Sequence, residues 1–598
     1  MKKELMSGNQ AIARGAFEAG ITFASGYPGT PSTEIMEEFA QYEGVYAEWA
    51  PNEKVGLEVA IGAALANTDA MATMKHVGVN VAADPLFTVA YTGIEGGLVI
   101  ITADDPSMHS SQNEQDNRNY AKFAKIPMLE PANPQEAKDF VKIALNISRK
   151  FDTPVFLRST TRLSHSKAPV SKGNRVTEIS KPAIKIDTEK YVMVPVNARK
   201  RRLEVEKRLN ALKAFAEKFP ENTMEINDTR VGIISAGVAY EYAKDSFPNY
   251  SYLKLGMVYP LPENLIREFS QKVKKIYVVE EMDPFLEEQI KAMGIKNVSG
   301  KEIFPFTKEF DPGIIKDSIQ GNEQKKQQIE LPEIPPRPPN MCPGCPHRGL
   351  FYSLKKCGKV FVNGDIGCYT LSFLKPLEGL HNCVCMGASI GMAHGMSKAL
   401  GDEGKGKVVA VLGDSTFLHS GITPLLNMVY NKSNALVIIC DNRTTAMTGM
   451  QEHPATGFTL QREKTKAVDF IKLAESLGVD SVRVADPYDL AKTTKTIKEE
   501  LSREGVSLIV SQRACVLFKR AGETAKPSLR IDLTKCTGCK VCLPIGCPAI
   551  SWQSFSAINA AAIQRNAPKQ DGFVVIDTSL CNGCSICQQI CKFDAIID

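Results

Sequence analysis

Eight of the sixteen cysteines lie in the last stretch of the chain and repeat one spacing. The first run contains Cys536, Cys539, Cys542 and Cys547, and the second contains Cys581, Cys584, Cys587 and Cys591. Each run begins C-x2-C-x2-C, and eight such thiolates are the ligand set of two [4Fe-4S] clusters. Zinc is the alternative, but zinc takes four ligands and would leave a third cysteine of each triplet without a metal. The spacing therefore predicts two clusters and a role in electron transfer.

The doubled run resembles the bacterial two-cluster ferredoxins, in which the fourth cysteine of each run binds the cluster of the other run. This resemblance groups Cys536, Cys539 and Cys542 with Cys591, and it groups Cys581, Cys584 and Cys587 with Cys547. Two details depart from the pattern. Four residues separate Cys542 from Cys547 where three are usual, and Lys592 follows Cys591 where a proline is usual. We expect both departures to be tolerated.

Length and composition indicate a multidomain globular protein. A chain of 598 residues is too long for one hydrophobic core, so we expect about three to five domains. The net charge of +5 is too small to indicate a nucleic-acid partner, and the basic run at 199–202 predicts a solvated helix face. We expect no membrane span and no export signal, because no apolar run is long enough. Cysteines at metal-binding spacing then indicate a reducing, cytoplasmic location.

Helical patterns alternate with short apolar runs along most of the chain, which predicts parallel α/β sheets. The expected fold class is α/β, with several doubly wound parallel-sheet domains and a C-terminal α+β domain of the two-cluster ferredoxin type. The expected boundaries are 1–185, 186–325 and 341–525 for three α/β domains, 326–340 for a Pro-rich linker, and 526–598 for the cysteine-rich domain.

Polar residues follow two predicted strands of the third α/β domain. The strand at 408–412 runs into Gly413, Asp414 and Ser415, and the strand at 436–440 runs into Asp441, Asn442, Arg443 and Thr444. Ligands of an open parallel sheet bind beyond the carboxyl ends of its strands, so we expect Asp414 and Asn442 to face one crevice. Their oxygens suit Mg²⁺ bound to phosphates, and Gly413 would let the backbone approach a diphosphate.

This spacing resembles the G-D-G…N motif of thiamine diphosphate enzymes, and 441–451 resembles its variant in 2-oxoacid:ferredoxin oxidoreductases. The resemblance implies that Asp414 and Asn442 bind Mg²⁺ through their side chains and that Thr444 binds it through its carbonyl oxygen. Ser415 replaces the second glycine of the motif. An ordinary Gly-Asp turn is the alternative interpretation.

Two N-terminal segments resemble the same family. Thiamine diphosphate needs a carboxylate against N1′ of its pyrimidine, because that hydrogen bond favours the imino tautomer. The segment 52–64 resembles the activating helix, with Glu53 as the match by register and Glu58 as the second candidate. The segment 27–33 resembles the substrate loop, in which Thr30 would hydrogen-bond the oxoacid. A turn followed by a helix cap, formed by Ser32 or Thr33 with Glu37 or Glu38, is the alternative for this loop.

The polar segment 103–118 follows a strand and has no periodicity, so it is either solvent-exposed or lines a site. This segment and 75–80 closely resemble the large subunits of indolepyruvate:ferredoxin oxidoreductases, which favours a site. His76 and His109 are candidates for polarising the substrate carbonyl or relaying protons. A structural role is an equal alternative for each histidine.

Four further cysteines match the positions that hold a cluster close to the cofactor in two-subunit relatives. They are Cys342, Cys345, Cys368 and Cys515. The hypothesis is a third [4Fe-4S] cluster, because electrons leaving the cofactor need a nearby first acceptor. Ala514 replaces the proline of the last motif, and a structural turn or a zinc site is the alternative. We expect the remaining cysteines, Cys357, Cys383, Cys385 and Cys440, to be packing thiols.

The resemblance covers essentially the whole chain and implies a function. The implied reaction is oxidative decarboxylation of aryl-2-oxoacids, such as indole-3-pyruvate, with CoA and oxidised ferredoxin, giving aryl-acetyl-CoA, CO2 and reduced ferredoxin. The three α/β domains would be pyrimidine-binding, transketolase C-terminal-like, and diphosphate- and Mg²⁺-binding, in that order. A smaller beta subunit would complete a heterodimer or an α2β2 heteromer.

Two other classes remain open at this point. A non-oxidative thiamine-dependent 2-oxoacid decarboxylase would have no need of the iron-sulfur cysteines. An electron-transfer subunit with inactive α/β domains is the other class, and in it Glu53 or Asp414 would have no role in cofactor binding or turnover.

Overall fold

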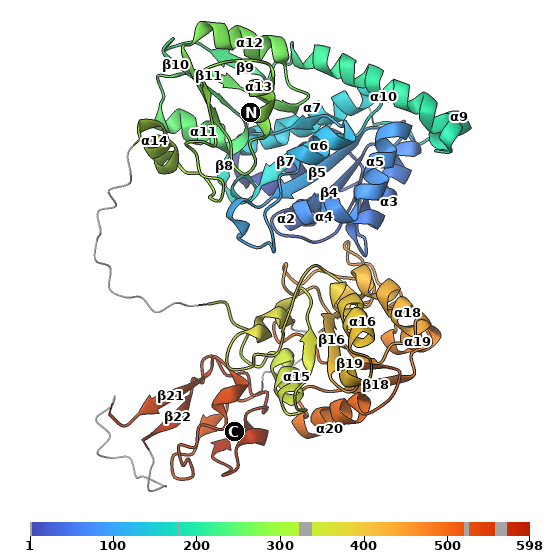
Figure 1. Cartoon of the computed structure of the whole chain (residues 1–598), viewed down its shortest axis with the longest axis vertical. Helices are drawn as coiled ribbons and strands as arrows, with labels where there is room; N and C mark the ends of the chain where they lie inside the picture. Colours follow the sequence, from blue (N-terminus) through green and yellow to red (C-terminus); the bar gives the residue numbers. More distant parts are fainter. Residues whose placement is uncertain (1–2, 178, 322–337, 519–525, 557–570) are drawn as a thin grey trace. The chain divides into compact units, whose positions relative to one another are not determined.

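Buried strands form three predominantly parallel sheets in a computed structural model that describes residues 3–177, 179–321, 338–518, 526–556 and 571–598 (Figure 1). The chain divides into two compact units, and each is described by itself. The first unit runs to residue 332 and includes 460–463, and the second contains the remaining residues. No helix in the described part of the chain is long and apolar enough to cross a membrane.

The larger sheet of the first unit has seven strands in the order β12-β6-β7-β5-β4-β2-β3. The strands are β2 (Phe23–Gly26), β3 (Tyr46–Trp49), β4 (Ala70–Lys75), β5 (Leu98–Asp104), β6 (Met128–Leu129), β7 (Val155–Thr160) and β12 (Met257–Tyr259). All neighbours pair in parallel except β12, which is antiparallel to β6. A strand from beyond residue 186 therefore completes the edge of this sheet.

Helices cover both faces of this sheet, because alternate residues of its strands point to opposite sides. One face packs α1 (Gly8–Glu18), α2 (Thr33–Phe39) and α7 (Pro134–Phe151), and the other packs α3 (Glu53–Leu65), α4 (His76–Val81) and α5 (Ala83–Thr92). On β5, Val99 and Ile101 join the first face, whereas Leu98 and Ile100 join the second. The sheet is thus doubly wound, as the sequence predicted.

A second sheet of the first unit has the order β14-β13-β10-β11-β9, with only β9 antiparallel. Its elements are β9 (Thr223–Glu225), β10 (Val231–Ser235), β11 (Ser251–Lys254), β13 (Lys275–Val279), β14 (Val298–Ser299), α11 (Gly237–Ser246), α12 (Glu263–Lys272), α13 (Phe285–Ala292) and α14 (Pro312–Gln320). Ile234 and Val278 belong to the same hydrophobic cluster as Leu98 and Leu57. The two sheets therefore share one core.

The basic run lies on α10 (Pro195–Ala216), which follows α9 (Thr188–Tyr191). Arg201 Nε donates to the Tyr91 carbonyl at 2.8 Å, and Arg208 Nη1 donates to the Ala90 carbonyl at 2.7 Å. These carbonyls belong to the last turn of α5, where a helix lacks internal donors. Part of the basic face of α10 therefore serves packing.

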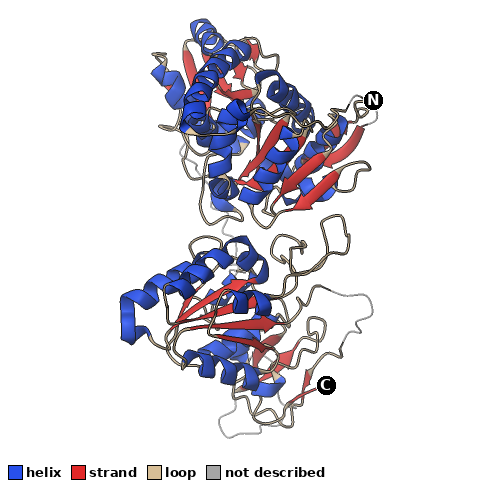
Figure 2. Cartoon of the chain, turned by 90° about the vertical axis from the view of Figure 1, so that its right-hand side faces the viewer, coloured by secondary structure: helices blue, strands red, loops and turns tan. Residues whose placement is uncertain are grey.

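The second unit contains an all-parallel sheet in the order β15-β16-β17-β19-β18, with helices on both faces (Figure 2). Its strands are β15 (Phe361–Asn363), β16 (Val408–Gly413), β17 (Ala435–Asp441), β18 (Ser481–Ala485) and β19 (Val506–Gln512). The helices α16 (Ala388–Leu400), α18 (Ile422–Tyr430) and α19 (Phe470–Ser476) pack on one face, and α15 (Pro346–Lys355) and α20 (Leu490–Leu501) pack on the other.

The C-terminal segment of this unit forms two small antiparallel sheets. They pair β20 (Arg530–Ile531) with β23 (Ile596–Ile597), and β21 (Ile550–Ser554) with β22 (Gly572–Ile576). Parallel α/β sheets followed by a small antiparallel domain confirm the predicted fold class. The predicted Pro-rich linker at 326–340 lies outside the described residues, apart from 338–340.

A buried guanidinium ties the polar loop at 105–117 to the second sheet of the first unit. Arg118, the first residue of α6 (Arg118–Ala124), contacts the Asp116 carboxylate at 2.5 Å and the Glu280 carboxylate at 2.7 Å. All three side chains are at most 3% exposed. A charge removed from water is tolerated only when it is paired, so each of these groups depends on the others.

We expect Arg118→Leu to lower the free energy of unfolding of the first unit by about 3–5 kcal/mol, because it leaves two buried carboxylates without their cation. Arg230→Leu is the matched control. Its guanidinium is 80% exposed and contacts Asp228 at 2.9 Å, so water compensates for the lost ion pair and stability should barely change. Urea denaturation followed by circular dichroism measures both, and equal losses would contradict the expectation.

Candidate cofactor and iron-sulfur sites

Glu53 is a buried carboxylate at the first turn of α3. Asn52 caps this helix, since its side-chain oxygen accepts from the Val55 amide at 2.9 Å. Glu53 is 6% exposed, and a Cβ atom on Gly78 would lie 2.7 Å from its Oε1. Only a glycine at position 78 therefore leaves room for this carboxylate. Glu58, the second candidate, is exposed and pairs with Lys54, so it does not face the buried side of the helix.

The loop with Thr30 lies beside the polar loop at 105–117. The Ser110 hydroxyl donates to the Thr30 carbonyl at 3.4 Å. Ser32 donates its hydroxyl to the Gly29 carbonyl at 2.9 Å, and it makes no side-chain cap on α2. The helix-cap alternative for Ser32 is therefore wrong, and the segment is a turn that meets the polar loop.

Lys75 belongs to the same neighbourhood and was not predicted. Its Nζ donates to the Ser110 carbonyl at 3.2 Å, and its side chain lies 3.1 Å from where a Cβ on Gly29 would stand. Burial lowers the pKa of Lys75, while the Asp105 and Glu53 carboxylates oppose this change. The signal that was overlooked is its position at the carboxyl end of β4, where α/β proteins collect ligand-binding residues.

The two candidate histidines occupy different environments. His76 is fully buried, and its Nε2 donates to the Asn113 carbonyl at 3.1 Å, which anchors the polar loop. Burial lowers the pKa of His76, and the nearby Lys75 cation lowers it further. His109 is 46% exposed and lies 3.1 Å from Glu309, which also pairs with Arg162. His76 thus contacts the same polar loop that contacts Thr30, whereas His109 lies at the surface.

The predicted magnesium-binding residues come together in the second unit. β16 and β17 pair in parallel, and their ends carry Asp414 and Asn442 as expected. The Arg443 amide donates to Asp414 Oδ2 at 2.9 Å, and the Thr444 amide donates to Asn442 Oδ1 at 3.1 Å. All of the predicted side chains are buried. A donor set made only of oxygens at the end of a parallel sheet fits Mg²⁺ held between protein and phosphates.

Tyr369 explains the glycine of this motif. A Cβ on Gly413 would lie 3.1 Å from the Tyr369 ring. The backbone of Gly413 is extended, with φ of −81°, so its conformation does not require glycine. Closeness to the ring is therefore the reason for Gly413, and the amide of Ser415 donates to Asp414 Oδ1 at 2.8 Å beside it.

Two buried histidines near Asp414 were missed by sequence reasoning. His453 Nε2 lies 3.3 Å from Asp414 Oδ2, while its Nδ1 accepts from the Ala455 amide at 3.3 Å. Burial lowers the pKa of His347 to about 4, although the Asp414 carboxylate opposes this. Neither residue has a distinctive spacing to the strands, so no local signal marks them.

The four cysteines of the third predicted cluster are neighbours. Cys342 and Cys345 share one turn, since the Cys345 amide donates to the Cys342 carbonyl at 3.1 Å. Burial, together with the nearby thiolates of Cys515 and Cys342, raises the pKa of Cys368 to about 11. The Cys515 amide also donates to the Asn442 carbonyl at 3.0 Å. This group is thus joined directly to the predicted magnesium loop.

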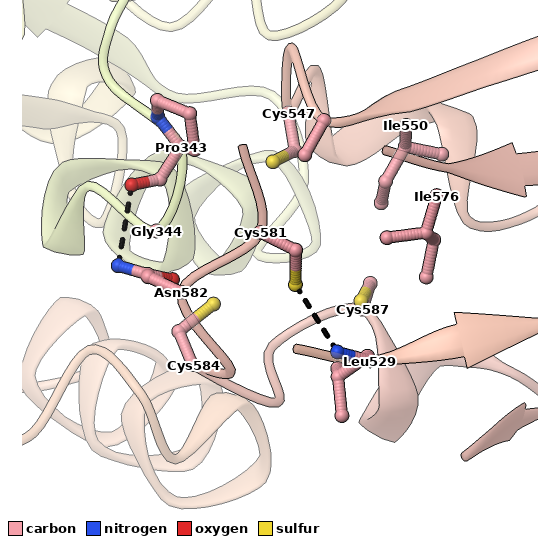
Figure 3. A pocket seen from close by; sticks show the side chains of 11 residues that line it. Pro343, Gly344, Leu529, Cys547, Ile550, Ile576, Cys581, Asn582, Cys584 and Cys587 are labelled. Atoms are coloured by element: carbon pink, nitrogen blue, oxygen red, sulfur yellow. Dashed lines mark hydrogen bonds between the residues drawn. The ribbon is translucent and has the colours of Figure 1, made fainter. Parts of the chain in front are cut away.

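The C-terminal cysteines separate into two groups. Burial raises the pKa of Cys542 to about 11, with Cys539, Cys591 and Cys536 as its thiolate neighbours. The second group surrounds a pocket, and Figure 3 shows the sulfurs of Cys547, Cys581, Cys584 and Cys587 around it. The remaining wall of this pocket is mostly apolar and consists of Pro343, Gly344, Leu529, Ala549, Ile550 and Ile576, together with Asn582.

A pocket with four thiols and mostly apolar walls fits a [4Fe-4S] cluster, because hydrophobic surroundings shield a cluster and tune its potential. The grouping of Cys547 with the second run follows the crossed pattern expected from ferredoxins. Of the other cysteines, Cys440 is buried and Cys357 is half-buried, whereas Cys383 and Cys385 are exposed. The expectation that Cys383 and Cys385 are packing thiols is therefore wrong.

Three family models match the chain. The C-terminal TPP-binding domain of thiamine pyrophosphate enzymes matches 365–511, the thiamine diphosphate-binding part of pyruvate flavodoxin/ferredoxin oxidoreductase matches 14–209, and a 4Fe-4S binding domain matches 574–597. The sheets, the oxygen donors of the magnesium loop and the cysteine groups lie within or beside these matches. Together they define a thiamine diphosphate-dependent oxidoreductase with iron-sulfur centres.

Full-length relatives narrow this class. Indolepyruvate oxidoreductase subunit IorA of Archaeoglobus fulgidus is 41% identical to this chain, and the alignment covers 100% of this chain and 97% of the relative. The subunit of the same name from Pyrococcus horikoshii is also 41% identical, and the alignment covers 99% of this chain and 96% of the relative. The chain belongs to this family of 2-oxoacid:ferredoxin oxidoreductases. A solved 2-oxoglutarate:ferredoxin oxidoreductase from Magnetococcus marinus is 18% identical over 54% of this chain and 65% of its own, with a TM-score of 0.45.

We expect the anaerobically purified protein to contain about twelve iron atoms per chain, which is four for each of three clusters. Cys584→Ala and Cys368→Ala should each remove about four, because they belong to different groups. Cys357→Ala is the control and should leave the iron content unchanged, since this thiol lies in neither group. Iron analysis with electron paramagnetic resonance measures the result, and about eight atoms in the unaltered protein would exclude the third cluster.

Proposed function

We propose that this chain is the cofactor-binding subunit of an enzyme that oxidatively decarboxylates aryl-2-oxoacids, such as indole-3-pyruvate, with CoA and ferredoxin. The products are the aryl-acetyl-CoA, CO2, one proton and two electrons, and the electrons leave one at a time to oxidised ferredoxin. The family assignment supports the reaction class, because relatives that match along the entire chain are named indolepyruvate oxidoreductases. Those relatives are named as subunits, so we propose a smaller beta subunit as partner, in a heterodimer or an α2β2 heteromer.

The hydrogen bond between Cys515 and Asn442 is the observation that carries the proposal. It joins a thiol of the first cysteine group to the loop that would hold Mg²⁺. A decarboxylase that releases an aldehyde has no use for this connection, because no electrons leave its cofactor. An oxidative reaction needs an electron acceptor close to the cofactor, and a cluster held by this cysteine group would be one.

Thiamine diphosphate, when bound, supplies the electron sink for decarboxylation. Asp414, Asn442 and the Thr444 carbonyl would hold its Mg²⁺, and the backbone at Gly413 and Ser415 would face the diphosphate. These residues are pre-arranged by main-chain hydrogen bonds, so little ordering is required when the metal binds. The amides of Ser415 and Arg443 orient the Asp414 carboxylate, and the buried His453 ring lies 3.3 Å from it.

In the first unit, Glu53 would accept the hydrogen bond of the pyrimidine N1′, because it is a buried carboxylate at a helix start. Thr30 would position the 2-oxoacid, and Lys75 would attract its carboxylate. His76 would act by holding the polar loop in place, since its Nε2 is occupied by the Asn113 carbonyl. His109 is retained as a candidate for contacting substrate from the surface end of the same loop.

The cysteine groups would carry the electrons outward. Cys342, Cys345, Cys368 and Cys515 would hold the cluster beside the cofactor, and the C-terminal domain would hold two more. The apolar pocket around Cys547, Cys581, Cys584 and Cys587 supports one of these assignments. The five-domain division of the chain, with boundaries near 185, 325, 340 and 525, is proposed on the same basis.

Turnover with a set of 2-oxoacids tests the substrate class. The complex with the small subunit, assayed without oxygen with CoA and a viologen dye, should prefer indole-3-pyruvate and phenylpyruvate over pyruvate and 2-oxoglutarate by at least about tenfold in kcat/KM. Such a ratio corresponds to about 1.4 kcal/mol of differential binding in the transition state. Preference for pyruvate would refute the substrate class, and CO2 release without dye reduction would indicate a non-oxidative decarboxylase.

Glu53→Gln should lower kcat by about 10²-fold to 10⁴-fold, the range for removing one positioned acid-base group. Thiamine diphosphate binding, measured by calorimetry, should persist because the Mg²⁺ ligands are intact. Asp414→Ala should instead abolish Mg²⁺-dependent binding. Glu58→Gln is the matched control on the exposed side of α3 and should keep full activity. Loss of activity in Glu58→Gln alone would transfer the role to Glu58.

A further inference from the structure

One buried arginine joins two cysteine loops that are about two hundred residues apart in sequence. Arg348 lies in the first turn of α15 and is 1% exposed. On one side its guanidinium donates to the Cys342 carbonyl at 3.1 Å, to the Met341 carbonyl and to Asn340 Oδ1 at 3.0 Å. On the other side it donates to the carbonyls of Gly546 at 2.5 Å and Ile545 at 3.4 Å. All of its donors are thus directed at the two loops.

The junction around Arg348 contains further contacts. Asn582 Nδ2 donates to the Pro343 carbonyl at 3.3 Å (Figure 3), and the Tyr488 hydroxyl donates to the Gly344 carbonyl at 2.5 Å. Gly344 has a positive φ of 68°, and a Cβ there would lie 2.1 Å from Asn582 Nδ2. The turn between Cys342 and Cys345 is therefore shaped to meet the C-terminal domain.

Apolar packing supports the same junction. Leu490 at the start of α20 packs with Ile545, Ile586 and Ile590 of the C-terminal domain in one buried cluster. Gln589 holds this helix start, because its side chain accepts from the Leu490 amide at 3.1 Å. The C-terminal domain is thus held against α15 and α20 rather than only tethered by the chain.

The charge of Arg348 is shared between two predicted clusters. Its hydrogen bonds to the carbonyls of Cys342 and Gly546 place the guanidinium between the turn of Cys342 and Cys345 and the loop that ends at Cys547. Cys342 and Cys345 belong to the group beside the cofactor, and Cys547 lines the pocket of Figure 3. Arginine stays protonated in proteins, so a fixed positive charge stands between the two sites.

We propose that Arg348 is a positioning residue for electron transfer: it fixes the separation of the cluster at Cys342 and Cys345 from the cluster at Cys547 and Cys584, and its charge favours the reduced form of both. The inference rests on the proposed function, since it requires a cluster at each site. Cluster potentials depend on nearby charge and hydrogen bonds, and residues just outside the ligands commonly change activity by 10-fold to 100-fold. A planar guanidinium suits this place, because it can donate to several carbonyls in two directions.

A merely structural role would predict something different. If Arg348 only satisfied carbonyl groups, its replacement would lower stability or iron content without changing the potential of the clusters that remain. Redox titration followed by electron paramagnetic resonance separates the two roles, because it measures each cluster's potential and the magnetic coupling between neighbours. Iron content is measured on the same samples.

The test uses the full chain with its partner subunit and three variants. Arg348→Gln should retain about twelve iron atoms, shift the potentials of the two neighbouring clusters to more negative values, and slow ferredoxin reduction about tenfold. The cluster at Cys536, Cys539, Cys542 and Cys591 should be unaffected. Arg348→Lys keeps the positive charge but lacks the planar guanidinium that donates in two directions. It should therefore have the cluster potentials of the unaltered protein, while the magnetic coupling between the two neighbouring clusters is weaker. Arg503→Gln removes a charge from the same unit at a half-exposed site and should change neither quantity.

Unchanged potentials and coupling in Arg348→Gln with full iron content would overturn the proposal. If that variant does not fold, Arg348→Lys and Tyr488→Phe carry the test, and coupling equal to that of the unaltered protein in both would overturn it. About eight iron atoms in the unaltered protein would also overturn it, since one of the two clusters would be missing. The proposed function would then be judged separately by the turnover assay.

Discussion

The hydrogen bond from the Cys515 amide to the Asn442 carbonyl connects the two kinds of chemistry in this chain. Asn442 belongs to the loop whose oxygens we propose as Mg²⁺ ligands, and Cys515 belongs to the cysteine group that contacts this loop. Electron transfer falls off with distance, so an oxidative enzyme must keep its first acceptor close to the cofactor. Both residues follow neighbouring parallel strands, β17 and β19, so the sheet itself enforces this closeness. In the proposed function, electrons reach the C-terminal domain only by way of the cysteine group that this hydrogen bond joins to the cofactor loop.

Burial is used differently in the two units. In the first, a carboxylate, a lysine and a histidine are all withdrawn from water around one polar loop, and their pKa shifts or hydrogen bonds follow from that desolvation. The buried pairs of Arg118 hold the loop against the second sheet. In the second unit, the buried groups are thiols in apolar walls. Such walls keep water from the clusters, which is the condition for a low and stable potential.

Some features of this chain follow from local sequence patterns, and others do not. β16 and β17 begin and end within a residue of the expected positions, because runs of β-branched residues specify strands locally. The fold class and the neighbourhood of Asp414 and Asn442 were predictable for the same reason, whereas the family was predicted from the resemblance of short motifs. The cap at Ser32 and the packing of Cys383 and Cys385 were not, since each depends on which distant residues fill the space around it. His347, His453 and Arg348 carry no spacing signal at all.

The sequence by itself determined which elements form and which ligand types lie at their ends, because periodicity and short-range spacing are properties of adjacent residues. It predicted the cysteines of the iron-sulfur sites in the same way, and the ferredoxin resemblance placed Cys547 with the second run. Only the tertiary structure decided that Glu53 rather than Glu58 faces Gly78 and that His76 Nε2 is occupied by a backbone carbonyl. These outcomes depend on contacts between residues far apart in the chain, and such contacts are selected by the packing of whole faces rather than by any local motif.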